Sequence, residues 1–568
     1  MAFRNHGELE FENVGAAWGL DQLGVSFGAA TGDLDGDGDL DIVYANYEAG
    51  VTVLRNDSDA GHRLTLSLNG TRSNRFGVGA LVRAESVSGI QVRQLVLARG
   101  YLSTSEPIVH FGLGNDDAIE RLTISWPSGH RQTFENVRAG QHYVVTEPST
   151  PPPVEKTERG SPASPTFSRF DQDVVPEVVA REGAGVDSNV QDFLPRRFDR
   201  LGPSIAVGDL TGTGGEDLLI GGTTDAPRQV LRSGTKQWVP LESVERGNGS
   251  KLDDGPLLLF HADADEHLDL LITKAGSGRP AGSPDYQPLL TIGDGKGGFN
   301  ESAAESLPPL AISAGAAVAA DWNHDGRLDV FLGGRTLPGK YPLPPRSAIL
   351  RNDGGKFADV TDELAPALRE IGMVTAALWT DVDADGWIDL LIAVEWGGIR
   401  YFRNIEGKKF EDRSAETGFD TAETGWWTSL ASADFNGDGR LDYVAGNVGL
   451  NTQYRASKEQ PALLYYGRMQ GGGAPQLIEA HYENDRLYPW RTLKDLGAKI
   501  PAVLKKFPRH NDYARATLDE IFGQERLNAA QRFAAMELRS GVFMSEGSGR
   551  FSFRPLRGLA QVAPIQGM

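Results

Sequence analysis

The sequence predicts a mainly β protein whose main unit is a β-propeller with calcium-binding loops. The 568-residue chain is rich in Gly (69) and Pro (31) at an ordinary 40% of hydrophobic residues, a composition typical of many short strands joined by tight turns. An Asp-rich segment also recurs, and five of its copies begin at residues 209, 261, 321, 381 and 434. This spacing of about 50 to 60 residues fits one four-stranded propeller blade.

Charge and composition narrow the possible partners. The formal net charge of −21, from 56 Lys and Arg against 77 Asp and Glu, argues against nucleic acid and favours bound cations. The chain has no Cys, so oxygen or His would have to bind any metal. It has no run of about 18 apolar residues that would span a membrane. Its first residues also lack the pattern of a signal peptide.

The Asp-rich segment has the spacing of a metal-binding loop. Its fullest copy, residues 33–41, is the first loop, and the second to sixth loops are 209–217, 261–269, 321–329, 381–389 and 434–442. We predict ligands at positions one, three, five and nine, with position seven contributing its backbone carbonyl. In the first and the three intact later loops these residues are Asp33, Asp35, Asp37, Asp39, Asp41, Asp321, Asn323, Asp325, Arg327, Asp329, Asp381, Asp383, Asp385, Trp387, Asp389, Asp434, Asn436, Asp438, Arg440 and Asp442.

Two loops are degenerate. The second loop keeps the frame of Asp209 and Asp217 but has neutral oxygens at Thr211 and Thr213, so we predict weak metal binding there. The third loop begins with His261 and lacks the Gly at position six. The sequence leaves open whether these two loops bind a metal.

Calcium is the metal that this loop chemistry favours. Alternate side chains of a tight loop can point at one centre, Gly at position six permits the sharp bend, and six or seven oxygens suit Ca²⁺. Mg²⁺ would require stricter octahedral geometry and would retain more water. An EF-hand would close with Glu at position twelve, whereas these loops have Asp at position nine and then β-branched or apolar residues. Each loop is therefore predicted to lead into a strand.

Two further patterns surround the loops. Small-residue segments precede them, as in Phe27-Gly-Ala-Ala30, and an Arg-Asn hairpin element follows several, as at Arg351-Asn352 and Arg403-Asn404. Together with the loops, these segments resemble the FG-GAP repeat of integrin α-chain propellers and of bacterial VCBS-repeat proteins. The resemblance covers most of residues 1–60 and 200–568. It implies an integrin-like, calcium-binding propeller of extracellular type.

A different unit interrupts the repeat. Between residues 62 and 147 the chain reads as strands around turns, with Arg75-Phe-Gly77, Gly100-Tyr101, His110-Phe111 and Trp126-Pro127 in order. These four motifs resemble the ASPIC/UnbV domain family. That resemblance transfers no catalytic residue.

The predicted domain order follows from these segments. Residues 1–60 form an FG-GAP repeat, interpreted as the tail of an upstream propeller, and 61–147 form the ASPIC/UnbV-like β domain. Residues 148–166 are a Pro- and Ser-rich linker. Residues 167–568 form the FG-GAP propeller, with a helical insertion at about 490–540. Because the last repeat stops before another loop, we expect a fragment of a longer protein.

The leading functional hypothesis is a non-catalytic, calcium-binding propeller that acts outside the cytoplasm or at the cell surface and binds a protein or a polysaccharide. The alternatives are a propeller-based polysaccharide lyase or hydrolase, and a scaffold subunit of a surface complex. No catalytic motif is recognised, and buried acids of raised pKa beside His, Tyr or Arg would favour the enzyme. Weak ligand-binding candidates, with packing between blades as the alternative, are Glu395, Trp396, Trp426, Trp427, Asn447 and Asn451.

Overall fold

The protein is mainly β, in agreement with the sequence prediction. The computed structural model describes residues 2–5, 11–20, 26–37, 39–46, 50–57, 61–97, 103–148, 167–169, 181, 183, 190–199, 201–233, 238–240, 252–303 and 305–567. No helix within these ranges is long and apolar enough to cross a membrane. The predicted linker, except for residue 148, lies outside the described residues.

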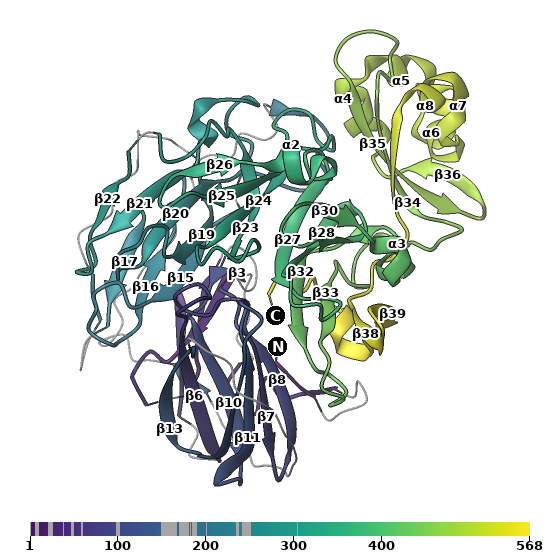
Figure 1. Ribbon diagram of the computed structural model, residues 1–568. Helices are drawn as coiled ribbons and strands as arrows, with labels where there is room; N and C mark the ends of the chain where they lie inside the picture. The colour runs from purple at the N-terminus through teal and green to yellow at the C-terminus, as the bar shows by residue number, and fades with distance from the viewer. Residues whose placement is uncertain are drawn as a thin grey trace.

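The main body consists of sheets arranged as in a β-propeller (Figure 1). Within the described part of the chain, six sheets each run outwards from an inner strand through three further strands. The inner strands of successive sheets lie side by side in the order β3, β15, β19, β23, β27 and β32. In chain order the strands are β3 (Ser26–Gly32), β4 (Asp41–Asn46), β5 (Thr52–Asn56) and β14 (Phe167–Arg169); β15 (Ile205–Gly208), β16 (Asp217–Ile220), β17 (Gln229–Arg232) and β18 (Val239–Pro240); β19 (Asp254–Phe260), β20 (Asp269–Lys274), β21 (Leu289–Gly293) and β22 (Phe299–Glu301); β23 (Ser313–Ala320), β24 (Asp329–Thr336), β25 (Ala348–Asn352) and β26 (Phe357–Asp359); β27 (Met373–Thr380), β28 (Asp389–Gly397), β29 (Ile399–Asn404) and β30 (Phe410–Asp412); and β32 (Ser429–Ala433), β33 (Asp442–Gly446), β38 (Gly541–Gly547) and β39 (Arg550–Pro555).

Small and apolar residues allow these sheets to pack face to face. β23, with the sequence Ser-Ala-Gly-Ala-Ala-Val-Ala-Ala, and β24 are buried along their whole length because each contacts neighbouring sheets on both faces. The core between the fourth and fifth sheets joins Phe331 and Ile349 to Trp379 and Phe402. Cores of the same kind join the other consecutive sheets. These six sheets, called here the ring, are therefore held together by contacts between sheets that follow one another in the sequence.

The position of the first sheet differs from the sequence prediction. Residues 1–60 were predicted to be the tail of a separate upstream propeller. In the structure the first sheet shares a core with the second, in which Val43 and Val53 pack with Ile205 and Leu218. β14, from beyond the predicted linker, completes the first sheet by pairing with β5. Both sheets thus belong to one ring, and the ASPIC/UnbV-like segment is inserted between them. The short hairpin of β1 (Phe3–Asn5) and β2 (Phe11–Asn13) precedes this sheet.

The inserted segment folds as a β-sandwich, called here the sandwich domain (61–148). Its two sheets, in the orders β10-β6-β13 and β12-β11-β7-β8, enclose an apolar core that includes Leu66, Val82, Ile124 and Trp126. In Figure 1 it lies below the ring, in purple and blue. The strands of these two sheets are β6 (His62–Asn69), β7 (Leu81–Ser86), β8 (Gly89–Gln94), β10 (Ile108–Gly114), β11 (Ala118–Ser125), β12 (Arg131–Arg138) and β13 (Gln141–Thr146). The domain also contains β9 (Ser103–Thr104), which belongs to neither sheet.

One part of the sandwich domain reaches the inner strands of the ring. The Ser103 hydroxyl accepts a hydrogen bond from the Ala29 amide at 2.8 Å, and Thr104 Oγ1 donates to the Leu257 carbonyl at 2.5 Å. The Gln94 side-chain amide donates to the Trp379 carbonyl at 3.2 Å. Since β9 also pairs in parallel with β15, this part of the domain touches the first, second, third and fifth sheets.

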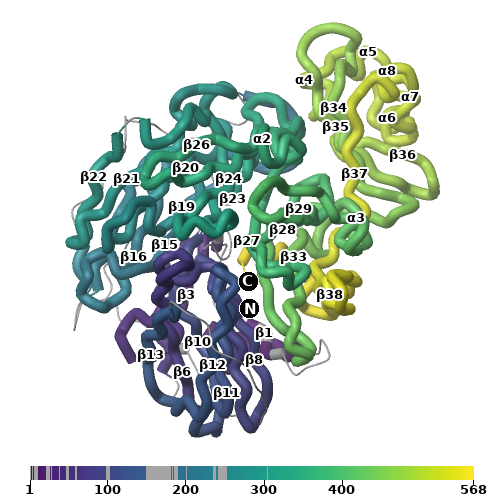
Figure 2. The backbone as a smooth tube through the Cα atoms, viewed as in Figure 1, coloured from purple at the N-terminus to yellow at the C-terminus, as the bar shows by residue number. Residues whose placement is uncertain are grey.

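A second insertion divides the sixth sheet between β33 and β38. The predicted helices are present as α4 (Leu493–Lys499), α5 (Pro501–Lys506), α6 (His510–Arg515), α7 (Leu518–Phe522) and α8 (Gln524–Ala529). The insertion is larger than predicted, because a sheet of β34 (Ala462–Gly467), β35 (Gln476–Glu483), β36 (Arg486–Pro489) and β37 (Gln531–Ala535) belongs to it. Figure 2 shows this lobe in yellow-green, beside the ring.

Short elements complete the sheets. β31 (Gly425–Trp426) pairs with β28. The turns between sheets contain α2 (Thr361–Leu364), α3 (Ser414–Thr417), η3 (Pro366–Leu368) and η4 (Phe419–Ala422). η2 (Pro284–Tyr286) lies between β20 and β21, and η5 (Gly558–Gln561) follows β39.

Candidate metal centres

The Asp-rich loops occupy equivalent places in the ring. Each joins the inner strand of its sheet to the second strand, as the fourth loop joins β23 to β24. Because neighbouring strands of a sheet are antiparallel, equivalent connections fall on the same face of a propeller. The sandwich domain contacts this face, since Arg63 pairs with Asp39 of the first loop at 3.2 Å and Arg75 with Glu266 of the third at 3.4 Å.

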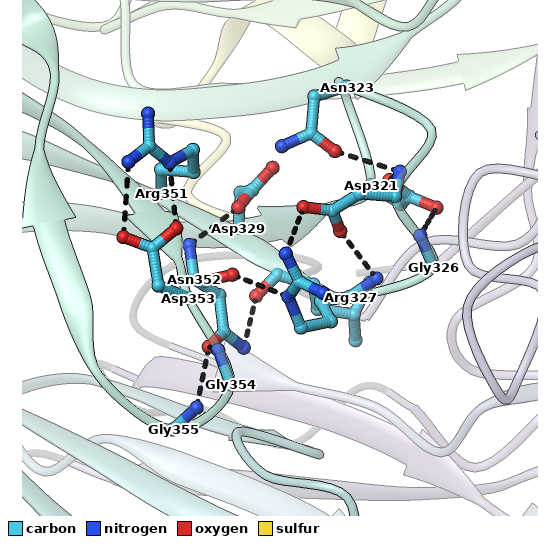
Figure 3. Close-up of polar contacts among 12 residues, drawn as sticks. Asp321, Asn323, Gly326, Arg327, Asp329, Arg351, Asn352, Asp353, Gly354 and Gly355 are labelled. Carbon is cyan, nitrogen blue, oxygen red and sulfur yellow. Dashed lines mark hydrogen bonds and ion pairs between the residues drawn. The ribbon is translucent and has the colours of Figure 1, made fainter.

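The carboxylate at position one organises each intact loop. In the fourth loop the two oxygens of Asp321 accept hydrogen bonds from the amides of Asp325 and Gly326, both at 3.0 Å (Figure 3). Asp381 accepts the equivalent bonds at 3.1 and 3.0 Å, and Asp434 does so at 3.1 and 2.8 Å. The predicted bend at position six is confirmed, because the Gly residues there have φ between 81° and 92°.

The carboxylate at position nine ties each loop to its own sheet. Asp389 is fully buried, and its oxygens accept from the Val382 amide at 3.0 Å and from the Asn404 amide at 2.7 Å. Asp329 accepts from the Asn352 amide at 2.7 Å, but its other oxygen is buried with no hydrogen-bond partner among the described residues. A carboxylate oxygen has two lone pairs, so it can accept such a bond and still ligate a metal.

The Arg-Asn element has a second role that its hairpin pattern did not indicate. The side-chain amide of Asn352 donates to the Ala262 carbonyl of the third loop at 2.8 Å, and its oxygen accepts from the amides of Gly354 and Gly355. Figure 3 shows Asn352 between its own turn and the fourth loop. Asn404 likewise donates to the Trp322 carbonyl at 2.8 Å. Each of these Asn residues thus connects two neighbouring sheets.

Three loops bring carboxylates together closely enough to share a cation. In each group the potential ligand oxygens all lie within 4.8 Å of one another. The groups are Asp33, Asp35 and Asp41; Asp263, Asp265 and Asp269; and Asp381, Asp383 and Asp385. The sequence left open whether the third loop binds a metal and selected none of its residues as ligands, because His261 replaces the first acid. A regular Asp spacing at positions three, five and nine was the signal that could have revealed it.

Burial raises the pKa of the carboxyls in these loops. Burial is the largest cause at Asp321 and Asp381, each with a pKa of about 7, and at Asp329, with a pKa of about 8. Neighbouring Asp residues add to the increase, and backbone amides oppose it. The pKa of Asp41 is raised to about 7 for the same reasons. Carboxylates that are buried and close together are stabilised by a divalent cation, which replaces the protons that they would otherwise retain.

Cationic side chains already balance part of this charge. The guanidinium of Arg327 lies 2.5 Å from Asp325, and that of Arg403 lies 2.5 Å from Asp383. Arg440 pairs with Asp438 at 2.6 Å. At position seven, therefore, the Arg side chains contact carboxylates, which leaves the backbone carbonyl as the possible ligand. Trp387 at the same position stacks on His324 of the neighbouring loop, with ring centroids 4.2 Å apart.

In the second loop, hydroxyl groups make the contacts between positions three, five and nine. Thr211 Oγ1 lies 3.0 Å from Thr213 Oγ1 and 3.1 Å from the Asp217 carboxylate. Asp209 accepts from the amides of Thr213 and Gly214 at 3.1 and 2.8 Å, as position one does in the intact loops. The frame of the loop is therefore retained with fewer charges.

Most of the weak ligand candidates are buried. Glu395 is 3% exposed and pairs with Arg196 and Arg335, whose charges outweigh burial and lower its pKa to about 2. Trp396 donates to Tyr341 at 2.6 Å. Trp426, Trp427 and Asn447 are also buried, whereas Asn451 is exposed. The buried residues match the alternative interpretation of packing between blades.

A cavity of about 680 Å³ lies where the sandwich domain meets the first and second loops, and it contains acids that the sequence analysis did not select. Glu106 and Glu216 line it together with Asp209. Oε1 of Glu106 lies 2.7 Å from Nε2 of His110.

FG-GAP-like repeats and an ASPIC/UnbV domain are found in the chain by comparison with protein families. The family described as FG-GAP-like repeat matches residues 262–332 and 381–445, and the family described as ASPIC and UnbV matches residues 70–152. Both resemblances seen in the sequence are thereby confirmed.

The chain is similar to cartilage acidic protein 1. The human protein is 31% identical over 148 residues, which are 25% of this chain and 22% of that protein. The mouse protein is 29% identical over 163 residues, or 28% of this chain and 25% of that protein. The Xenopus tropicalis protein is 30% identical over 130 residues, or 22% and 20%. The matched region thus spans a quarter or less of these relatives.

Proposed function

We propose that the protein is a calcium-stabilised binding or adhesion module that acts outside the cytoplasm and has no catalytic role. The observation that carries this proposal is the grouping of three carboxylates within 4.8 Å in each of three loops. Hard oxygen ligands in a flexible loop suit Ca²⁺, and extracellular modules of this type bind it with a Kd of about 10⁻⁴ to 10⁻³ M. Such sites fill outside cells and stay empty in the cytosol.

The repeat family and the similarity to a protein named for cartilage support an extracellular adhesion-type role. We propose a protein or polysaccharide as the ligand, bound by the ring, the sandwich domain or both. A role as a scaffold within a surface complex is compatible with this proposal. Alanine substitutions on the sandwich domain, for example at Arg75, would distinguish binding through that domain from binding through the ring.

Calcium-dependent unfolding tests the metal part of the proposal. The native protein is titrated with CaCl₂, bound ions are counted by native mass spectrometry, and thermal unfolding is recorded with calcium and with EGTA. We expect about three to five bound ions and a higher unfolding temperature in calcium. The absence of both bound ions and stabilisation would contradict the proposal.

One observation favours a polysaccharide lyase or hydrolase as a second candidate. Burial and the nearby charge of Glu106 raise the pKa of Glu216 well above its ordinary value, and His110 contacts Glu106 beside a cavity. A carboxyl of raised pKa near a second carboxyl is a common acid–base arrangement. Incubation with acidic and neutral polysaccharides, followed by measurement of new reducing ends and unsaturated products, tests this candidate. Products that persist in Glu216→Gln would argue against it.

A further inference from the structure

The lobe inserted into the sixth sheet differs in charge from the rest of the chain. From β34 to β37, residues 462–535 contain 11 Lys and Arg against 8 Asp and Glu, a net charge of +3. The whole chain has a net charge of −21, so the remaining residues together carry −24. An anionic partner is therefore repelled by most of the protein and attracted by this lobe.

The cations of the lobe are concentrated on helices α4 to α6. Apolar residues of these helices, such as Leu496, Val503 and Tyr513, are buried in a core with the sheet of β34 to β37. α4 contacts both α5 and α6, and Figure 1 shows the three helices in the upper part of the lobe. Two acids, Asp495 and Asp512, are exposed on residues 493–515. The exposed cations of this segment, called here the basic surface, are Lys494, Lys499, Lys505, Lys506, Arg509 and Arg515.

Half of these cations have no acidic partner. Lys499 pairs with Asp192 at 2.5 Å, and Nζ of Lys506 donates to the Glu520 carbonyl at 2.7 Å. The cations that make no ion pair with any described residue are Lys505, Arg509 and Arg515. An exposed ammonium or guanidinium without an ion pair keeps its hydrogen-bond donors for an anionic group of a partner.

The basic surface lacks the apolar groups that other anionic partners require. Of the large apolar side chains that are exposed in the described part of the chain, Leu504 alone lies on these helices. A helix that binds a membrane surface needs a continuous apolar face, and here that face is buried in the core of the lobe. A protein interface has an apolar or aromatic centre, for which one Leu is too little. The charge of −24 on the remaining chain disfavours nucleic acid.

We propose that the basic surface binds an acidic polysaccharide, a polymer whose sugars carry sulfate or carboxylate groups. Clusters of Lys and Arg are typical of surfaces that bind sulfated polysaccharides or nucleic acid. Charge-assisted hydrogen bonds from the ammonium and guanidinium groups to the sulfate or carboxylate oxygens hold such a polymer without apolar contacts. This inference rests on the proposed binding role and names its ligand class, but it does not require a bound metal.

The test measures the binding of defined probes to the full chain by isothermal titration calorimetry. The probes are heparin, polygalacturonate, neutral dextran, a DNA duplex, and vesicles of phosphatidylcholine with phosphatidylserine. Each is titrated at low and at physiological NaCl in EGTA, so that calcium cannot bridge two acids. One triple variant changes the basic surface by Lys505→Gln, Arg509→Gln and Arg515→Gln. The matched control changes three exposed cations of the ring by Lys296→Gln, Lys340→Gln and Arg550→Gln, and thermal unfolding verifies that both variants fold.

We expect heparin or polygalacturonate to bind more tightly than the other probes, with a Kd that rises with NaCl. Whichever of the two binds more tightly identifies the anionic group that the surface recognises. Loss of three exposed ion pairs should weaken this binding about 3- to 150-fold in the variant of the basic surface, and the ring control should leave it unchanged.

Three results would overturn the inference: no binding of either acidic polysaccharide, tighter binding of DNA or vesicles, or a Kd that changes equally in the two variants. The proposed calcium-stabilised module is tested separately by ion counts and calcium-dependent unfolding. A protein that gains stability from calcium but binds neither acidic polysaccharide refutes this inference alone. A protein that binds a polysaccharide through the basic surface but no calcium refutes the metal part of the proposed function instead.

Discussion

Loss of the fifth-loop ion should be visible as a loss of calcium-dependent stability. Asp381 is the position-one residue of the fifth loop, and its two oxygens hold the amides of Asp385 and Gly386. With a Kd of about 10⁻⁴ to 10⁻³ M, one ion at 10 mM free Ca²⁺ contributes about 1.4 to 2.7 kcal/mol to the free energy of unfolding. In Asp381→Asn this contribution should be almost entirely lost.

Without calcium the same substitution should have little effect. Asn retains one acceptor oxygen, and the lost hydrogen bond costs about 1 kcal/mol. This cost is offset because the charge of Asp381 is buried and repelled by Asp383 and Asp385. The expected difference between variant and wild type is therefore within about 1 kcal/mol in EGTA.

Urea unfolding, followed by Trp fluorescence in 10 mM CaCl₂ and in EGTA, measures both quantities. Asp420→Asn, an exposed acid in the turn after the fifth sheet, is the matched control and should retain the full response to calcium. The reasoning would be refuted if Asp381→Asn kept the calcium-dependent increment, or if it lost equal stability in both solutions.

Four further outcomes follow from the loops and the core. The pKa of Asp381 is about 7 in the folded protein, against an ordinary value of 3.8. Without calcium, the free energy of unfolding should therefore fall as the pH rises from about 4 to 7. Calcium should flatten this dependence of the unfolding free energy on pH, which urea unfolding at several pH values would measure. Gly386→Ala should cost about 1 to 2 kcal/mol in urea unfolding because φ is 92°, whereas Ala384→Gly, at φ 60°, should not destabilise. Asn352→Ala should cost about 2 to 3 kcal/mol by the same assay, since it leaves amides and a carbonyl without partners. Glu395→Gln should lower the free energy of unfolding by about 3 kcal/mol at pH 7, because it removes one partner of a buried ion pair. In the wild type, the stability that Glu395 contributes should be lost as the pH falls from about 4 to 2. Acid unfolding of both proteins would show this loss.

The local features of the loops could be predicted from the sequence because they depend on spacing within nine residues. The alternating acids, the bend at Gly386 and the following strand are all properties of a short segment. The mainly β composition was predictable for a similar reason, since Gly, Pro and β-forming residues act locally. The repeated spacing then indicated the propeller.

Features that depend on pairing between distant segments were not predictable from spacing. The membership of residues 26–56 in the same ring depends on the core that Val43 forms with Ile205. The acidic group of Glu106 and Glu216 exists only because β9 pairs with β15. The group at Asp263 was hidden because the sequence analysis weighted the missing first acid more than the remaining regular spacing.

The insertion of the sandwich domain near the start of the chain has a consequence for folding. Sheets two to five can each dock on the sheet made just before, which requires only loops of moderate length to close. The hydrogen bonds that involve Ser103, Thr104 and Gln94 instead join residues 74, 153 and 285 positions apart. Such contacts are slow to form because they require most of the chain to be in place. We therefore expect refolding to show an early phase in which the sheets assemble and a later phase in which the sandwich domain docks on their inner strands.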